Sequence, residues 1–319
     1  MKKKETKRNF NKNKMKFKLI LKIGIMLFLI GVLFFVKFYF FNKKDFILKF
    51  NKNKIEKIYL NQDKIKEETS NNNFNGIRRK AIIDFPDKHS FGKKYPILIV
   101  LHSSGGNYNQ THSMFGKLAN EETFIGIYPQ GVNNKWNSFI KNSTKNEVDD
   151  VYFISKLIDY SMNNFNVDKN KIYVVGFSNG GSLAQKLGIK LSDKISAVVS
   201  ISASLEKGLE VENNSTVSIM QINSKKDKII PYKGGKGVND NEFLSAENSI
   251  KYWAKRSNCD IFPNKSDLNQ NYIEFNYENC DNQSKVKLIS VLDSGHHISQ
   301  KIGEMPLIDF IWNFLKNLE

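Results

Sequence analysis

The sequence predicts an α/β domain in which helices cover a mostly parallel sheet. From about residue 76 onward, short apolar runs alternate with amphipathic stretches, which is typical of strands and of the helices packed on them. The chain has 319 residues and is 40% hydrophobic, so it can bury one substantial core. No internal repeat is visible in the sequence, which argues against solenoids and propellers.

Seven apolar runs are the expected strands of a single sheet. Asp149 and Asp150 are suitable N-terminal caps for a helix over Val151–Asn163; a second helix is expected just after Ser178 and a third over Met305–Leu318. Seven strands in one sheet fit one domain of about 240 residues. The expected strands are Arg79–Phe85, Tyr95–Leu101, Phe124–Tyr128, Lys171–Val175, Ala197–Ser202, Val217–Ile222 and Val286–Val291.

The net charge of +17 is concentrated near the N-terminus. Residues 1–60 carry 17 Lys and Arg against 3 Asp and Glu, so +14 of the +17 lies there and the rest of the chain is close to neutral. Proteins that bind nucleic acids gather their basic residues on a folded face. The charge distribution therefore predicts no nucleic-acid partner.

An apolar segment follows the basic tail, residues 1–18. The stretch from Leu19 to Phe41 is interrupted only by Lys22 and Lys37, whose side chains can extend toward the interface, so it reaches the roughly 20 residues needed to cross a bilayer. A cleaved signal peptide is the alternative, but no small-residue cleavage site follows. The sequence predicts an uncleaved transmembrane signal anchor over residues 19–41.

The charges on either side of this anchor predict its orientation. The net charge is +9 through Lys22 and +4 from Lys43 to Lys57, which favours a cytoplasmic N-terminus in a single-pass protein of the cell membrane. The folded domain, residues 76–319, would then face the periplasmic or extracellular side. Residues 42–75 are rich in Lys, Asn, Glu and Gln and are expected to form a polar stalk.

Cys259 and Cys280 are the only cysteines. An even pair on an exported domain predicts one disulfide, and two separate buried thiols are the alternative. Closing a loop of this length would stabilise the fold by about 3 kcal/mol.

The strongest local motif is Gly176-Phe177-Ser178-Asn179-Gly180, which has the spacing G-x-S-x-G. An apolar run precedes it and an amphipathic stretch follows it. A strand, a sharp turn at a serine and a helix make the nucleophile elbow of α/β-hydrolases, which lifts the hydroxyl above the sheet. The sequence therefore predicts the α/β-hydrolase fold with Ser178 as the nucleophile.

In this fold the acid and the base follow the nucleophile along the chain. Asp227 lies in the loop just after an expected strand, whereas its competitors Asp240 and Glu242 lie farther along a polar segment. His296 and His297 follow the last expected strand, so one of them is the base, and His296 is preferred.

Two donors are needed for the oxyanion of a tetrahedral intermediate. One is expected to be the backbone N–H of Asn179, the residue after the nucleophile. The other is expected in the turn after Tyr95–Leu101, where Ser104 is preferred and Ser103 is the alternative. His102 is expected to order this loop rather than to act as a base.

The sequence has no H-E-x-x-H or similar metal-ligand spacing, no Rossmann fingerprint and no P-loop. We therefore expect a site that uses neither a metal nor a cofactor.

Several motifs in the same order resemble the extracellular esterases related to polyhydroxybutyrate depolymerases and to feruloyl and acetylxylan esterases. The resemblance covers roughly residues 77–318 and lies in motifs rather than in continuous similarity. The motifs are Tyr128-Pro129-Gln130-Gly131 followed by Trp136, Val148-Asp149-Asp150-Val151, Gly176 to Gly181, Asp227 to Tyr232, Trp253 with Asn258-Cys259, and Gly295-His296.

The resemblance implies a serine hydrolase of carboxylic esters, with the nucleophile at Ser178, the acid at Asp227 and the base at His296. It also supports a bridge between Cys259 and Cys280, because the family often pairs cysteines there.

Trp136 and Tyr232 are candidates to line the substrate pocket, with a core or lid position as the alternative for Trp136. The family usually has His-Gly where this chain has His102-Ser103. The predicted function is a membrane-anchored serine esterase that acts on a small-molecule or polymeric ester. The alternatives are a peptidase on the same fold, and a catalytically silent binding or scaffold protein.

Overall fold

The computed structural model describes residues 56–60, 79–86, 92–122, 124–140, 148–211 and 216–318. The predicted basic tail, the predicted anchor at 19–41 and most of the predicted stalk lie outside these residues. Within the described residues, no helix is long and apolar enough to cross a membrane. The anchor therefore stays a prediction from the sequence.

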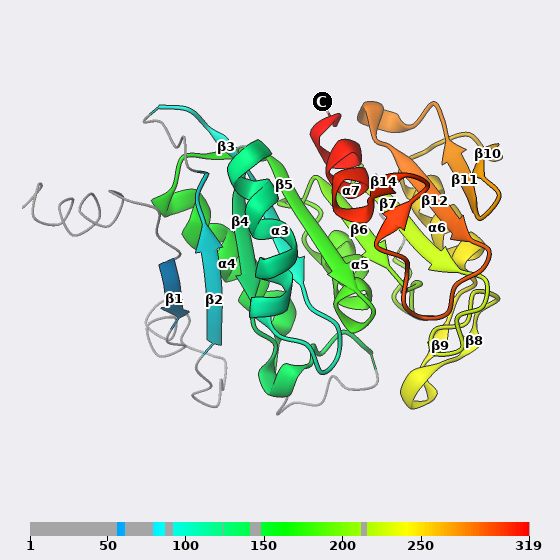
Figure 1. Ribbon diagram of the computed structural model, residues 1–319, viewed down its shortest axis with the longest axis horizontal. Helices are drawn as coiled ribbons and strands as arrows, with labels where there is room; N and C mark the ends of the chain where they lie inside the picture. The colour runs from blue at the N-terminus through cyan, green and yellow to red at the C-terminus, as the bar shows by residue number, and fades with distance from the viewer. Residues whose placement is uncertain are drawn as a thin grey trace, which may run out of the picture. The chain divides into compact units, whose positions relative to one another are not determined.

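A ten-stranded sheet forms the centre of the described chain, in the order β1-β2-β4-β3-β5-β6-β7-β12-β11-β10 (Figure 1). The six strands from β4 to β12 in this order run parallel, whereas β2 and β11 pair antiparallel with their inner neighbours. The mostly parallel sheet confirms the predicted fold class. The strands are β1 (Glu56–Leu60), β2 (Arg79–Asp84), β3 (Tyr95–Leu101), β4 (Ile125–Pro129), β5 (Val167–Phe177), β6 (Ala197–Ile201), β7 (Ser218–Ser224), β10 (Asn264–Asn269), β11 (Tyr272–Tyr277) and β12 (Val286–Val291).

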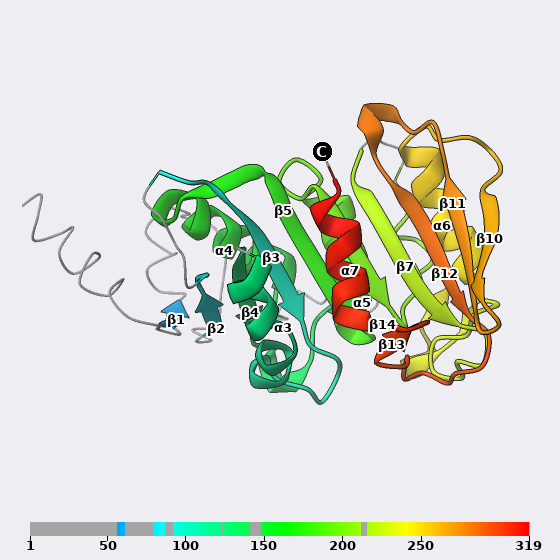
Figure 2. The same cartoon turned by 45° about the horizontal axis from the view of Figure 1, so that its top comes forward.

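Helices cover both faces of this sheet (Figure 1 and Figure 2). One face carries α4 (Asp150–Asn164), α5 (Asn179–Lys190) and α6 (Ala246–Arg256). The other face carries α3 (Tyr108–Glu122) and α7 (Leu307–Lys316). The result is a three-layer α/β/α domain.

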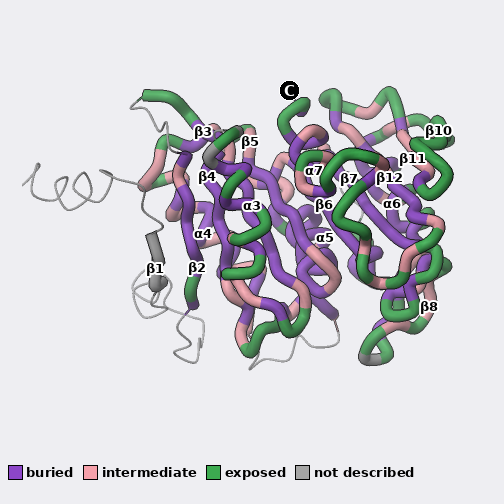
Figure 3. The backbone as a smooth tube through the Cα atoms, viewed as in Figure 1, coloured by how far each residue is buried: buried purple, intermediate pink, exposed green. Residues whose placement is uncertain are grey.

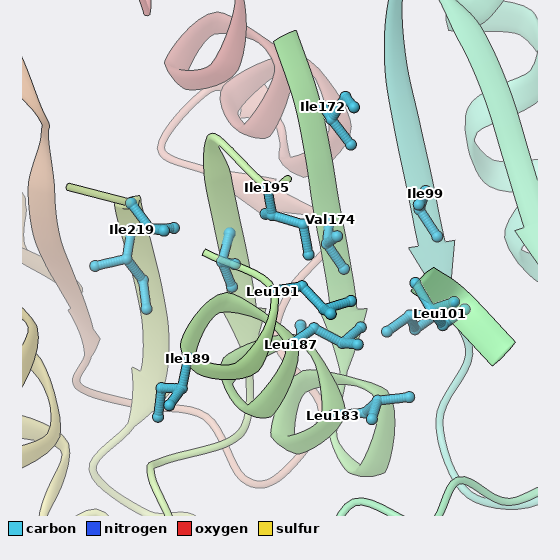
Figure 4. Packing of buried hydrophobic residues seen from close by; sticks show 14 of the residues in the cluster. Ile99, Leu101, Ile172, Val174, Leu183, Leu187, Ile189, Leu191, Ile195 and Ile219 are labelled. Carbon is cyan, nitrogen blue, oxygen red and sulfur yellow. The ribbon is translucent and has the colours of Figure 1, made fainter. Parts of the chain in front are cut away.

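The alternation of side chains along the strands builds two apolar layers. In β3, Ile99 and Leu101 face α4, α5 and α6, whereas Leu98 and Val100 face α3 and α7. Figure 3 shows the central strands buried along most of their length. Figure 4 shows Leu183, Leu187 and other residues of the first layer packed between α5 and the sheet. Both faces of the parallel strands are thus buried, which explains their continuous apolar runs.

The sheet is larger than the seven predicted strands. β1 lies inside the stretch predicted as a stalk, residues 42–75, and pairs antiparallel with β2. At the opposite edge, β10 is exposed at every position and therefore has no apolar period to detect. The helices α3 and α6 were also not predicted; their polar residues obscure the apolar stripe that each one buries.

Candidate active site

Ser178 stands at the turn between β5 and α5 in a backbone conformation that needs support. Its φ of 52° and ψ of −115° lie outside the regions that non-glycine residues favour. Two glycines make room for the turn: a Cβ at Gly176 would lie 2.0 Å from the carbonyl oxygen of Gly180, and a Cβ at Gly180 would lie 2.6 Å from that of Leu101. The G-x-S-x-G spacing is thus required by close backbone approach.

Three predicted side chains meet at the carboxyl edge of the sheet. His296 Nε2 lies 2.8 Å from Ser178 Oγ, and His296 Nδ1 lies 2.8 Å from Asp227 Oδ2. The other carboxylate oxygen of Asp227 accepts the backbone N–H groups of Ile229 at 2.8 Å and Ile230 at 3.0 Å. With a carboxylate at Nδ1, the proton of a neutral imidazole sits on Nδ1, which leaves Nε2 free to accept from the serine.

The competing residues do not reach this row. His297 is exposed, and its ring centroid lies 6.0 Å from that of His296. Glu242 pairs with Lys207 at 3.0 Å on the surface, and Asp240 ends an exposed 3-10 turn. Among the acid and base candidates from the sequence, Asp227 and His296 are the ones that form the hydrogen-bonded row with Ser178.

Asn179 lies directly after Ser178, and its side chain is buried. As the first residue of α5, its N–H has no partner within the helix and is available at the turn beside Ser178. Its buried amide also holds the loop after β4: Oδ1 accepts from Trp136 N at 2.7 Å, and Nδ2 donates to Trp136 O at 3.1 Å and to Ser138 Oγ at 2.7 Å. Ser104, the predicted second donor, lies exposed in the turn after β3, so that role stays a prediction.

His102 joins the end of β3 to the loop after β4. Its Nδ1–H donates to the carbonyl oxygen of Ser103 at 2.8 Å, and Nε2 accepts the N–H of Gly131 at 3.0 Å. Burial lowers the pKa of His102, because a charged ring would lose hydration there. The neutral ring uses both nitrogens for backbone contacts, which confirms the predicted loop-ordering role.

A buried ion pair between Arg79 and Asp150 stabilises the loop after β4. Arg79 Nη2 lies 2.5 Å from Asp150 Oδ1, and both side chains are about 1% exposed. Asp150 also accepts the backbone N–H of Asn137 at 2.6 Å, while Asp149 caps α4 by accepting from Tyr152 N at 2.9 Å. The capping role predicted for Asp149 is therefore confirmed, whereas the contacts by which Asp150 ties β2 to the active-site loop were not predicted.

The two aromatic residues predicted to line the pocket, Trp136 and Tyr232, are buried. Trp136 is 3% exposed, stacks on His102 with centroids 4.7 Å apart, and donates from Nε1 to His102 O at 2.8 Å. Tyr232 is 7% exposed; its hydroxyl lies 2.5 Å from Ser290 Oγ and 3.2 Å from Glu247 Oε1. Burial raises the pKa of Tyr232 to about 12. Both rings pack at the edge of the sheet, which agrees with the core alternative for Trp136, and a role in lining the substrate pocket stays a prediction.

Cys259, just after α6, and Cys280, just after β11, form the predicted disulfide. In the described part of the chain, no group of three or more His, Cys, Asp or Glu side chains is placed to hold a metal ion.

Comparison with known proteins points to esterases. The profile of the Phospholipase/Carboxylesterase family matches residues 129–257. Feruloyl esterase B of Piromyces equi is 29% identical over 252 residues, which cover 75% of this chain and 45% of that protein. A bifunctional acetylxylan esterase/xylanase of Neocallimastix patriciarum is 24% identical over 230 residues, 69% of this chain and 31% of that protein. The chain thus spans less than half the length of these two relatives.

Solved structures agree on the fold. An acetyl xylan esterase from Aspergillus awamori superposes with a TM-score of 0.57 at 13% sequence identity, over 82% of this chain and 99% of that one. At this identity the likeness concerns the fold alone.

Proposed function

We propose that this chain is a serine esterase of the α/β-hydrolase superfamily that hydrolyses carboxylic esters through Ser178, His296 and Asp227. Its similarity in sequence to esterases, and in fold to an acetyl xylan esterase, supports the proposal. The observation that carries the proposal is the continuous hydrogen-bonded row of the three side chains, 2.8 Å at each contact. The strained backbone of Ser178 supports it, since such strain is concentrated at functional sites.

The geometry fits an acyl-enzyme mechanism. His296 Nε2 takes the proton of Ser178 Oγ as the oxygen attacks the ester carbonyl carbon, and Asp227 stabilises the resulting imidazolium. The carbonyl π electrons move to the oxygen, whose negative charge the backbone N–H of Asn179 stabilises in this proposal. Collapse expels the alcohol, which receives the proton from His296. Water then attacks the acyl group on Ser178 by the same proton transfers and releases the acid.

We propose acyl groups of the acetyl or feruloyl kind as substrates, on a small molecule or on a polymer. The sequence similarity to proteins named feruloyl and acetylxylan esterases supports this class. Hydroxybutyrate esters remain within the proposal through the motifs shared with polyhydroxybutyrate depolymerases.

We also propose that residues 19–41 anchor the protein in the cell membrane and that the esterase domain lies outside. The disulfide supports this placement, because such bonds persist in oxidising compartments. A tag at the C-terminus should react with an impermeant reagent on intact cells. Labelling only after lysis would reverse the proposed orientation.

The ester chemistry is tested on the full chain in mild detergent with short-chain nitrophenyl esters. Ser178→Ala should lower kcat by roughly 10³-fold or more while the thermal midpoint changes little. His297→Ala is the matched control, because this exposed neighbour of His296 lies outside the row. Equal rates for the wild type and Ser178→Ala would remove the proposal. Faster cleavage of a nitroanilide than of an ester with the same acyl group would favour a peptidase.

A further inference from the structure

Two serine hydroxyls from neighbouring strands hold the loop that carries His296. Ser202, directly after β6, donates from Oγ to the carbonyl oxygen of His296 at 2.6 Å. Ser224, the last residue of β7, donates from Oγ to the carbonyl oxygen of Ser294. We infer that Ser202 and Ser224 are positioning residues that place the imidazole between its two partners, an inference that rests on the proposed esterase function.

Ser202 repeats the backbone geometry of the nucleophile one strand further along the sheet. Both residues end a parallel strand with a φ of 52°. Ser178 N donates to Ile201 O, and Ser202 N donates to Ile222 O, each at 2.8 Å. Because a non-glycine residue with positive φ is held only by strong surroundings, the repeat points to a functional constraint at Ser202 as well. One hydroxyl meets the imidazole, and the other meets the backbone of the same histidine.

The position of the loop depends on these hydroxyls because backbone pairing stops earlier. Lys225 N donates to Val291 O and Leu292 N donates to Asn271 O, each at 2.8 Å, which fixes the end of β12. After Leu292, serine hydroxyls rather than backbone N–H groups donate to carbonyl oxygens of the loop. The hydroxyls of Ser202, Ser224 and Ser294 donate to the carbonyl oxygens of His296, Ser294 and His297, respectively.

The hydroxyls of Ser202 and Ser224 are both shielded from solvent. Ser202 is 4% exposed and Ser224 is 0% exposed, so neither hydroxyl exchanges its loop partner for bulk water. The imidazole must lie within 2.8 Å of Ser178 Oγ and of Asp227 Oδ2 at once. A displacement of about 1 Å at such a group costs on the order of 10²-fold in rate. Loss of either serine hydroxyl should therefore lower kcat and have a smaller effect on KM.

The test compares Ser202→Ala and Ser202→Gly in the full chain. Glycine accepts the positive φ without strain, so the pair separates loss of the hydroxyl from the strained backbone. We expect both variants to lower kcat by about 10- to 100-fold and to leave KM within about 3-fold.

Ser196→Ala is the matched control. Ser196 lies just before the opposite end of the same strand, and its hydroxyl also donates to a backbone carbonyl oxygen, that of Ile172 at 3.1 Å. This variant should lose some thermal stability and keep the wild-type kcat and KM. If both Ser202 variants behave like Ser196→Ala, the hydroxyl has only a structural role and the inference fails.

A measurement without turnover separates this outcome from failure of the proposed function. The proton on His296 Nδ1, shared with Asp227, should give a downfield proton resonance in the wild type. We expect Ser202→Ala to shift or broaden it, and Ser196→Ala to leave it in place. An unchanged resonance in Ser202→Ala would overturn the inference even if the chain proved to be no esterase. Absent Ser178-dependent hydrolysis together with a shifted resonance would overturn only the proposed function.

Discussion

Replacing Asn179 by alanine separates the two roles of this residue. The backbone N–H at position 179, the proposed oxyanion donor, stays in place. The side chain loses one accepted bond from Trp136 N at 2.7 Å and two donated bonds, to Trp136 O at 3.1 Å and to Ser138 Oγ at 2.7 Å. The variant should therefore lower the free energy of unfolding more than it affects the chemical step.

The size of the loss follows from burial. Trp136 is 3% exposed and Ser138 is 0% exposed, so their polar atoms cannot regain full hydration in the variant. With about 1 kcal/mol for each hydrogen bond, and more where a buried partner is left unsatisfied, we expect a loss of about 3–5 kcal/mol. In a domain of this size, that corresponds to a fall of roughly 10 °C in Tm.

Thermal and urea unfolding measure this loss, and Asn179→Asp is the matched variant. Aspartate keeps an acceptor for Trp136 N but places a carboxylate beside Trp136 O and removes the donor to Ser138. It should destabilise the protein despite its similar shape. In a double-mutant cycle, Asn179→Ala and Ser138→Ala should be non-additive by about 1 kcal/mol. Two results would refute the role of the Asn179 side chain in stabilising this loop: a Tm of Asn179→Ala within about 2 °C of the wild type, or strictly additive effects of Asn179→Ala and Ser138→Ala.

Three further predictions concern the acid, the disulfide and a buried phenol. Asp227→Asn should lower kcat for ester hydrolysis by about 10⁴-fold, because an amide no longer holds His296 in the tautomer that accepts from serine; a loss below about 10-fold would contradict this role. Replacing Cys259 and Cys280 together by alanine should lower the free energy of urea unfolding by about 3 kcal/mol, and an unchanged midpoint would count against it. Burial raises the pKa of Tyr232 from 10.0 to about 12, so its stabilisation is complete below pH 10 and is lost as the pH rises toward 12. The stability difference between the wild type and Tyr232→Phe should therefore shrink between pH 10 and about pH 12, whereas a constant difference would show that the phenol does not titrate in this way.

The parts of the site that could be predicted are those fixed by local or ordered features of the sequence. Gly176 and Gly180 are needed because a Cβ at either position would lie 2.0 to 2.6 Å from a backbone oxygen, so the elbow is recognisable over five residues. Asp227 and His296 follow from the order of the strands, because each lies in the loop after a parallel strand and these loops share one edge. Burial along both faces of the central strands makes those strands easy to recognise as well.

The supporting contacts could not be predicted, because they join residues far apart in the chain. Arg79 and Asp150 are separated by 71 positions, and Ser202 and His296 by 94. Neither pair belongs to a motif with a fixed spacing. For Trp136 the sequence left two positions open, because an aromatic side chain can face a core or a pocket, and only tertiary packing shows that its ring stacks on His102. The anchor at 19–41 rests on hydropathy alone.

His102 and His296 lie at the same edge of the sheet, but their surroundings suit them to different roles. His102 is 2% exposed, and its Nε2 is already occupied by the N–H of Gly131. To take a proton from a serine it would have to break that contact and carry a charge where burial lowers its pKa. The side chain of His296 is 16% exposed and lies beside the carboxylate of Asp227, which stabilises the charged ring, and its Nε2 faces Ser178 Oγ. Exchange of a proton with a substrate is therefore open to His296 and closed to His102, although both rings lie at the carboxyl edge of one sheet.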